Sequence, residues 1–130
     1  MAGKPLLLLV EDNEDFQNLY GLVAEEAGFE VDRVLSGSEA LARLDRDPLP
    51  AIVLLDSRLP GASGMEILHA ARANQKWSQV PIYMMTADLR GAQEFRNIPP
   101  DAPHPDGVFE KGGSSIREIR ELFKKLRGTT

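Results

Sequence analysis

The feature that most constrains the fold is an unbroken apolar run that ends in one carboxylate. Residues 51–60 read Ala-Ile-Val-Leu-Leu-Asp-Ser-Arg-Leu-Pro, and Asp56 is the first charged residue of the run. Such a run is typical of a central parallel strand that is covered on both faces. Asp56 would then emerge at the carboxyl edge of the sheet, where open α/β sheets place their sites. Taken alone, Asp56 is more simply interpreted as a turn residue before Pro60 and Gly61.

Three further apolar stretches are predicted to be strands of the same sheet, and each ends in polar residues. They are residues 5–10, followed by Glu11 and Asp12; residues 81–86, ending in Thr86; and Val108 and Phe109, followed by Glu110 and Lys111. If these strands are parallel neighbours, their carboxyl ends converge on one edge of the sheet. That edge would hold Glu11, Asp12, Asp56, Thr86 and Lys111.

Three carboxylates at one edge of a sheet require a cation. Two carboxylates about 4 Å apart repel by roughly 4 kcal/mol at an effective dielectric constant of about 20. Oxygen ligands suit Mg²⁺, which binds through one or two carboxylates, waters and a phosphate. We therefore expect Glu11, Asp12 and Asp56 to form a magnesium site.

The remaining elements indicate an α/β fold with a parallel sheet and right-handed crossovers. Residues 30–34 alternate and are expected to be an edge strand. Helices are predicted over residues 14–27, 36–46, 63–74, 90–96 and 115–126. The fourth of these helices is short, and four prolines between residues 97 and 106 exclude helix or strand there.

Helical spacing and capping signals give specific local expectations. Capping boxes are predicted at Ser36 and Glu39, at Ser63 and Glu66, and at Ser115 and Glu118. The side chains expected to face the core are Phe16, Leu19, Tyr20, Val23, Ala27, Leu41, Leu44, Met65, Leu68, Ala71, Ile116, Ile119, Phe123 and Leu126. Trp77 is expected in a loop that covers the edge of the sheet.

Composition excludes several classes of function. The chain has 130 residues, no cysteine and a net charge of −5, so we expect one domain in a reducing compartment and no direct binding of nucleic acid. Its first apolar run is too short for a signal or membrane segment, so we expect a cytoplasmic protein without a membrane partner. The last helix carries Arg117, Arg120, Lys124, Lys125 and Arg127. These cations fit a solvated helix end, with a docking surface for an acidic partner as the alternative.

The ordered set of polar residues resembles the receiver domains of two-component response regulators. The resemblance rests on the acidic pair after the first strand, on Asp56 with Pro60 and Gly64 behind it, on Thr86 and Ala87, and on Lys111. It covers residues 1–130 and implies one receiver domain of flavodoxin-like, doubly wound topology. The strands would follow the order 2-1-3-4-5, and helices would cover both faces of the sheet. The chemotaxis regulator of this fold has the same strand order.

The resemblance also implies a function. Asp56 would accept a phosphoryl group from a phosphohistidine of a sensor histidine kinase or a histidine phosphotransfer protein. The chain would assist its own phosphorylation and dephosphorylation without being an enzyme, and would signal to an output protein that the sequence does not identify.

The same resemblance assigns roles to the individual residues. Mg²⁺ would be held by Asp12, Asp56 and the backbone carbonyl of Arg58, with Glu11 acting through a water. The phosphoryl oxygens would be bound by Thr86, the N–H of Ala87 and Lys111. Each residue also has a simpler interpretation, because acidic residues suit a helix start, a threonine hydroxyl can bind backbone, and most lysines lie on surfaces.

Other classes of protein fit the same residues less well. A flavodoxin-type cofactor site needs phosphate-binding N–H and hydroxyl groups in the first loop, which here reads Glu-Asp-Asn-Glu-Asp. A dinucleotide enzyme needs a glycine fingerprint that is missing. Aspartate-nucleophile phosphatases usually carry a second aspartate where this chain has Arg58. The remaining alternative is a pseudo-receiver, an interaction module that works without phosphorylation.

The chain departs from the family pattern in three places. Gly112 follows the lysine where receivers usually carry a proline, and Val108 stands where many carry a switch aromatic. The fourth helix is short and is followed by the proline-rich loop of residues 97–106. We therefore expect residues 87–106 to carry the signal; the alternative is that they form a fixed loop and that partners bind another face, such as the first helix. His69 and His104 are expected to be surface residues and not phosphodonors.

Overall fold

Five parallel strands form a single sheet in the order β2-β1-β3-β4-β5, as predicted. The computed structural model describes residues 3–127, without the side chains of residues 113 and 114. The strands are β1 (Leu6–Val10), β2 (Glu30–Val34), β3 (Ile52–Asp56), β4 (Ile82–Thr86) and β5 (Gly107–Glu110). The edge position predicted for residues 30–34 is confirmed.

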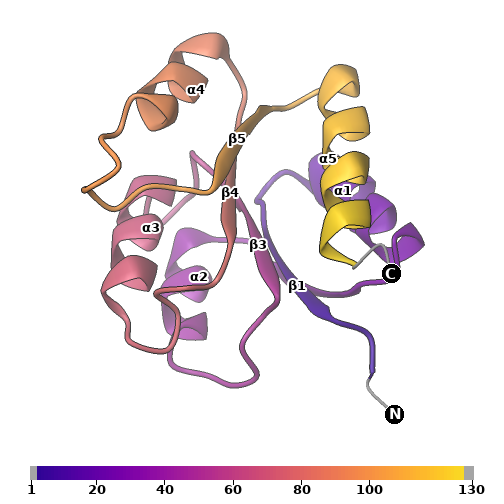
Figure 1. Cartoon of the computed structure of the whole chain (residues 1–130), viewed down its shortest axis with the longest axis horizontal. Helices are drawn as coiled ribbons and strands as arrows, with labels where there is room; N and C mark the ends of the chain where they lie inside the picture. The colour runs from indigo at the N-terminus through magenta and orange to yellow at the C-terminus, as the bar shows by residue number, and fades with distance from the viewer. Residues whose placement is uncertain (1–2, 128–130) are drawn as a thin grey trace.

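Helices cover both faces of this sheet (Figure 1). They are α1 (Glu14–Glu26), α2 (Gly37–Arg43), α3 (Gly64–Ala73), α4 (Leu89–Arg96) and α5 (Gly113–Leu126). One core forms between the sheet and α1 with α5, and a second forms between the sheet and α2, α3 and α4. Among residues 3–127, no helix combines the length and the apolar composition needed to cross a membrane.

The register of the central strands determines where the predicted site lies. All five residues of β3 are buried, which explains the unbroken apolar run. Val10, the last residue of β1, pairs with Leu55 of β3. The residue after each of these two carries a carboxylate: Glu11 directly follows β1, and Asp56 is the last residue of β3. Because the strands are parallel, both lie at the carboxyl edge of the sheet.

The helix starts confirm one of the three predicted capping boxes in full. Ser63 and Glu66 form the reciprocal pair at the start of α3. The Ser36 hydroxyl accepts a hydrogen bond from the N–H of Glu39, which is one half of the second box. The box predicted at Ser115 and Glu118 is wrong, because α5 begins two residues earlier with Gly112 as its N-cap and without a side-chain cap.

Two leucines predicted to face the core are exposed. Leu19 is 39% exposed because it lies to the side of the apolar stripe of α1, and Leu126 is 42% exposed because it is the last residue of α5. The centres of these stripes, among them Tyr20 in α1 and Ile119 and Phe123 in α5, are fully buried. Apolar spacing therefore predicted the buried face of each helix, but overestimated the width of that face in α1 and its length in α5.

Trp77 lies in the core and not over the edge of the sheet. It is 1% exposed and belongs to the cluster beneath α2 and α3 that includes Leu8 and Ile82. The guanidinium carbon of Arg43 lies 5.4 Å from the centre of its ring. Arg43 is itself buried and also pairs with Asp32, so a charged residue of α2 closes this core over the tryptophan.

The segment after β4 has the short helix and irregular loop that the prolines predict. Helix α4 has eight residues and buries Ala92 and Phe95. The loop is nevertheless tied to the body at one end. Arg72 of α3 donates to the carbonyl of His104 and pairs with Asp106, and the Asp106 carboxylate accepts the N–H of Ile82 at 2.7 Å.

Candidate functional site

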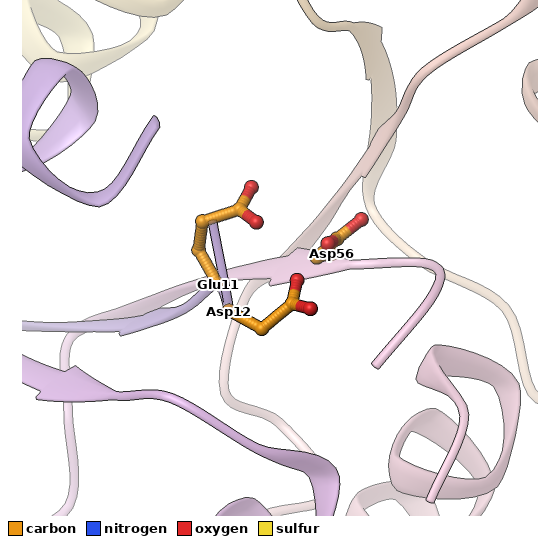
Figure 2. Close-up of side chains that lie close together, drawn as sticks. All are labelled: Glu11, Asp12 and Asp56. Atoms are coloured by element: carbon orange, nitrogen blue, oxygen red, sulfur yellow. The ribbon is translucent and has the colours of Figure 1, made fainter. Parts of the chain in front are cut away.

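Three carboxylates gather at the carboxyl ends of β1 and β3 (Figure 2). Glu11, Asp12 and Asp56 each offer an oxygen atom, and these atoms lie within 4.8 Å of one another. Glu11 is fully buried and Asp56 is 4% exposed, whereas Asp12 faces solvent. The three acidic residues predicted to share one edge of the sheet are therefore brought together.

Lys111, which directly follows β5, compensates two of these charges. Its ammonium lies 2.6 Å from Oε1 of Glu11 and 3.1 Å from Oδ2 of Asp56. The short contact with Glu11 is an ion pair without good hydrogen-bond geometry, since Oε1 of Glu11 accepts no well-aligned hydrogen bond from the described residues. Lys111 is therefore no ordinary surface lysine, since its side chain is 9% exposed and joins two acidic groups.

This arrangement perturbs the pKa values of both partners. Burial raises the pKa of the Glu11 carboxyl from its ordinary 4.5 to about 7; Lys111 and the N–H of Asn13 oppose that rise, and the charge of Asp56 adds to it. Burial alone lowers the pKa of Lys111, but Glu11 and Asp56 outweigh it and hold that pKa above its ordinary 10.5.

Hydrogen bonds from neighbouring groups orient the carboxylates. The N–H of Asn13 donates to Oε2 of Glu11 at 3.0 Å, and the N–H of Arg58 donates to Oδ1 of Asp56 at 3.3 Å. The buried side-chain amide of Gln17 donates to the Glu11 carbonyl at 3.1 Å. Both ends of Glu11, the carboxylate and the backbone carbonyl, are therefore held by the start of α1.

A steric constraint explains why the residue eight positions after Asp56 is a glycine. A Cβ atom at Gly64 would lie 2.6 Å from the carbonyl oxygen of Asp56 and 2.8 Å from the Cα of Ser57. Contacts this short with backbone atoms exclude any side chain unless the backbone moves. Gly64 therefore lets the start of α3 approach the loop that follows Asp56.

Thr86 and Ala87 follow β4 at the same edge of the sheet. Thr86 is 1% exposed, and its hydroxyl donates to the backbone carbonyl of Asp88 at 3.1 Å. Its own carbonyl accepts the N–H of Lys111 at 2.7 Å, which links the ends of β4 and β5. Ala87 is exposed. The simpler interpretation of Thr86, a strand-end hydroxyl that binds backbone, describes the contact in this structure.

The donor set fits a hard divalent cation. All side-chain donors in the cluster are carboxylate oxygens, the kind of ligand that Mg²⁺ prefers. Asp12 faces solvent, so an ion bound there could keep several waters, as Mg²⁺ usually does. Glu11, Asp12 and Asp56 could therefore hold Mg²⁺.

Several residues that shape this site were not predicted from the sequence. Phe16 contacts Lys111, Gln17 binds the Glu11 carbonyl, and Asp88 caps α4 while accepting the Thr86 hydroxyl. Gln17 could have been noticed, since it is a polar residue on the same helical face as the buried Tyr20. The two histidines are exposed, as predicted.

Comparison with known proteins gives consistent matches. The family model of the response regulator receiver domain matches residues 7–98. Over 94 residues the chain is 37% identical to the phosphate regulon transcriptional regulatory protein PhoB of Rhizobium meliloti, a match that covers 72% of this chain and 41% of PhoB. Over 89 residues it is 34% identical to the polar-differentiation response regulator DivK of Brucella ovis, covering 68% of this chain and 72% of DivK.

A solved structure extends the similarity to the C-terminal part of the chain. The receiver domain of sensor histidine kinase PA1611 from Pseudomonas aeruginosa PAO1 superposes with a TM-score of 0.80 at 26% identity, covering 98% of this chain and 99% of that one. That structure holds a magnesium ion coordinated in its active site cleft. The family model ends before Lys111, so Val108 and Gly112 lie outside that match, whereas the short helix α4 lies within it.

Proposed function

Because the chain belongs to the receiver domains of response regulators, we propose that Asp56 accepts a phosphoryl group from a phosphohistidine of a sensor histidine kinase or a histidine phosphotransfer protein. The observation that carries this proposal is the buried contact of Lys111 with both Glu11 and Asp56. Burying an ion pair of this kind costs free energy, because the charged groups lose their hydration. The presence of the pair is explained if the function of this edge requires a negative charge with a cation beside it.

In the proposed reaction, a carboxylate oxygen of Asp56 attacks the phosphorus atom of the phosphohistidine. The new P–O bond forms as the P–N bond to the imidazole breaks, so the products are an acyl phosphate on Asp56 and a free imidazole. Lys111, which already lies 3.1 Å from Asp56, would bind an oxygen of the transferred group. Thr86 would turn its hydroxyl from the Asp88 carbonyl toward a second oxygen, and the N–H of Ala87 would serve a third.

The residues that would hold Mg²⁺ are Asp12, Asp56 and the carbonyl of Arg58, with Glu11 acting through a water. When bound, the ion supplies positive charge that offsets the charge of the phosphoryl oxygens. The likeness to the PA1611 receiver domain, whose structure contains Mg²⁺ in its cleft, supports this assignment.

The chain would act as a phosphoacceptor that assists its own phosphorylation and dephosphorylation, in the cytoplasm. The new charge on Asp56 would change the affinity for an output protein and would not create a direct contact with nucleic acid or membrane. This agrees with the composition, since a net charge of −5 opposes binding to polyanions.

A small phosphodonor tests this proposal without the native kinase. Incubation with acetyl phosphate and Mg²⁺ should add one phosphoryl group, seen by intact mass, and Asp56→Asn should abolish it. Asp15→Asn, which changes an exposed aspartate in the first turn of α1, is the matched control and should remain competent. Modification of the Asp56→Asn protein would contradict the assignment, and an unmodified wild-type protein would indicate a pseudo-receiver.

A further inference from the structure

Two aromatic residues of α1 lie beside the lysine of the site. Phe16 and Tyr20 are one helical turn apart, with ring centroids 5.8 Å apart and an angle of 13° between the rings. The ammonium of Lys111 lies 4.7 Å from the centre of the Phe16 ring. An ammonium at this distance is attracted by the negative face of the ring. Lys111 therefore contacts a ring of α1 as well as two carboxylates.

The second ring of this pair reaches the residues that follow the lysine. Tyr20 is fully buried, and its hydroxyl accepts the N–H of Gly112 at 3.4 Å and lies 3.5 Å from the hydroxyl oxygen of Ser115. The Ser115 hydroxyl in turn donates to the carbonyl of Gly112 at 2.8 Å. A buried tyrosine hydroxyl requires such partners, and here they are Gly112, in the turn between β5 and α5, and Ser115, in the first turn of α5.

This turn has little else to fix its conformation. Gly112 has a φ of +132°, which side-chain-bearing residues rarely adopt, and a Cβ placed there would meet no atom within 4 Å. It is also the N-cap of α5 without a side-chain cap. The glycine is therefore required by backbone conformation and not by crowding, and a flexible residue directly follows Lys111.

We propose that Phe16 and Tyr20 are positioning residues for Lys111: the Tyr20 hydroxyl fixes the Gly112 turn, and the Phe16 ring supports the ammonium beside Asp56. In this chain the two aromatic residues restrain the segment at Lys111 and Gly112, which a rigid proline after the lysine would otherwise do. This inference rests on the proposed function, because the position of Lys111 affects ligand binding only if a phosphoryl group is bound at Asp56.

Two binding properties of the site, its affinity for Mg²⁺ and its affinity for a phosphoryl group, depend on different residues. The carboxylates bind Mg²⁺, whereas Lys111 binds the phosphoryl group. Removing the Tyr20 hydroxyl should therefore leave Mg²⁺ affinity unchanged and weaken the binding of a phosphoryl analogue. A general loss of structure would weaken both.

The test uses beryllofluoride as the analogue, at saturating Mg²⁺, with amide chemical shifts as the readout. In Tyr20→Phe, which removes one oxygen atom, beryllofluoride affinity should fall roughly fivefold, as the loss of one partly buried hydrogen bond implies. Affinity for Mg²⁺ alone should stay within about twofold of the wild-type value. Tyr83→Phe is the matched control, since Tyr83 packs on the same face of the sheet against Phe109, and it should change neither affinity.

A double-mutant cycle with Lys111→Ala identifies the route of the effect. If Tyr20 acts through Lys111, adding Tyr20→Phe to Lys111→Ala should cause no further loss of beryllofluoride affinity. An equal loss in both backgrounds would overturn the proposal, as would an unchanged affinity in Tyr20→Phe. A wild-type protein that binds Mg²⁺ but no beryllofluoride would overturn the proposed function itself, and this inference with it.

Discussion

Each charged residue of the site lies at or just after the end of a strand, and Lys111 contacts two of the three carboxylates. The sequence predicted this common edge, because Glu11, Asp12 and Lys111 follow strands and Asp56 ends one. It did not indicate that Lys111 would pair with Glu11 at 2.6 Å, since that distance depends on how β5 twists toward β1 across two intervening strands. The burial of Glu11, which this pairing only partly offsets, has an electrostatic consequence that can be measured.

The raised pKa of Glu11 predicts how the metal-free protein responds to pH. An acid whose pKa rises from 4.5 to about 7 on folding binds its proton more tightly in the native state. Its contribution to stability is therefore fully present below pH 4.5 and is lost as pH rises through about 7. The loss could reach about 3 kcal/mol at 1.36 kcal/mol per pKa unit.

Urea unfolding between pH 5 and pH 8 in the presence of a chelator measures this effect. The difference in unfolding free energy between Glu11→Gln and wild type should shift in favour of Glu11→Gln as pH rises across this range. Glu14→Gln, an exposed neighbour in α1, should show no such trend. A pH-independent difference for Glu11→Gln would show that Glu11 does not titrate in this interval.

At the scale of elements, helix spacing and strand order were predictable, and the exceptions have local causes. The start of α5 was misplaced because a serine three residues before a glutamate resembles a capping box, whereas Ser115 instead binds the Gly112 carbonyl. Trp77 was misplaced because a loop tryptophan gives no periodic signal. The short α4 and the loop after it were predicted correctly, because prolines act on their own backbone.

The structure divides the expected signalling segment into two parts. Residues 87–98 contain α4, and Thr86 reaches them through the Asp88 carbonyl. Residues 102–106 are held by Arg72, whose side chain is 16% exposed and binds both His104 and Asp106. Phosphorylation would draw the Thr86 hydroxyl from Asp88, so we expect only the first part to respond.

Amide hydrogen exchange with and without beryllofluoride checks this expectation. Protection should change across residues 87–98 and stay constant across residues 102–106. Arg72→Ala should raise exchange in residues 102–106 without the ligand, whereas Arg90→Ala, at an exposed position in α4, should not. Unchanged protection throughout residues 87–113, with changes elsewhere such as α1, would show that another face carries the signal.

At the scale of the whole molecule, the acidic edge lowers the stability of the metal-free protein and provides a binding site for a cation. Three carboxylates share that edge, and Lys111 contacts only Glu11 and Asp56 among them. The third, Asp12, adds repulsion that an ion would relieve. A ligand that binds only the folded state stabilises it in proportion to the logarithm of its concentration, so the global stability reports on this site.

Mg²⁺ should therefore stabilise the wild-type protein by about 2.7 kcal/mol at a concentration of about 100 times its dissociation constant. Asp12→Asn should lose most of this increment while being at least as stable as wild type without metal, because one uncompensated charge is gone. Urea unfolding with and without MgCl₂ measures both effects, with Asp15→Asn as control. An undiminished Mg²⁺ effect in Asp12→Asn would place the ion elsewhere.

The contact between Tyr20 and Gly112 also has an evolutionary consequence. Proline, the residue that receivers usually carry after the lysine, has a fixed negative φ and no N–H, whereas Gly112 has a φ of +132° and donates its N–H to Tyr20. Gly112→Pro alone would remove that hydrogen bond and exclude the present turn. We therefore expect positions 20 and 112 to be epistatic, so that a redesign that treated them separately would choose the wrong residue for this background.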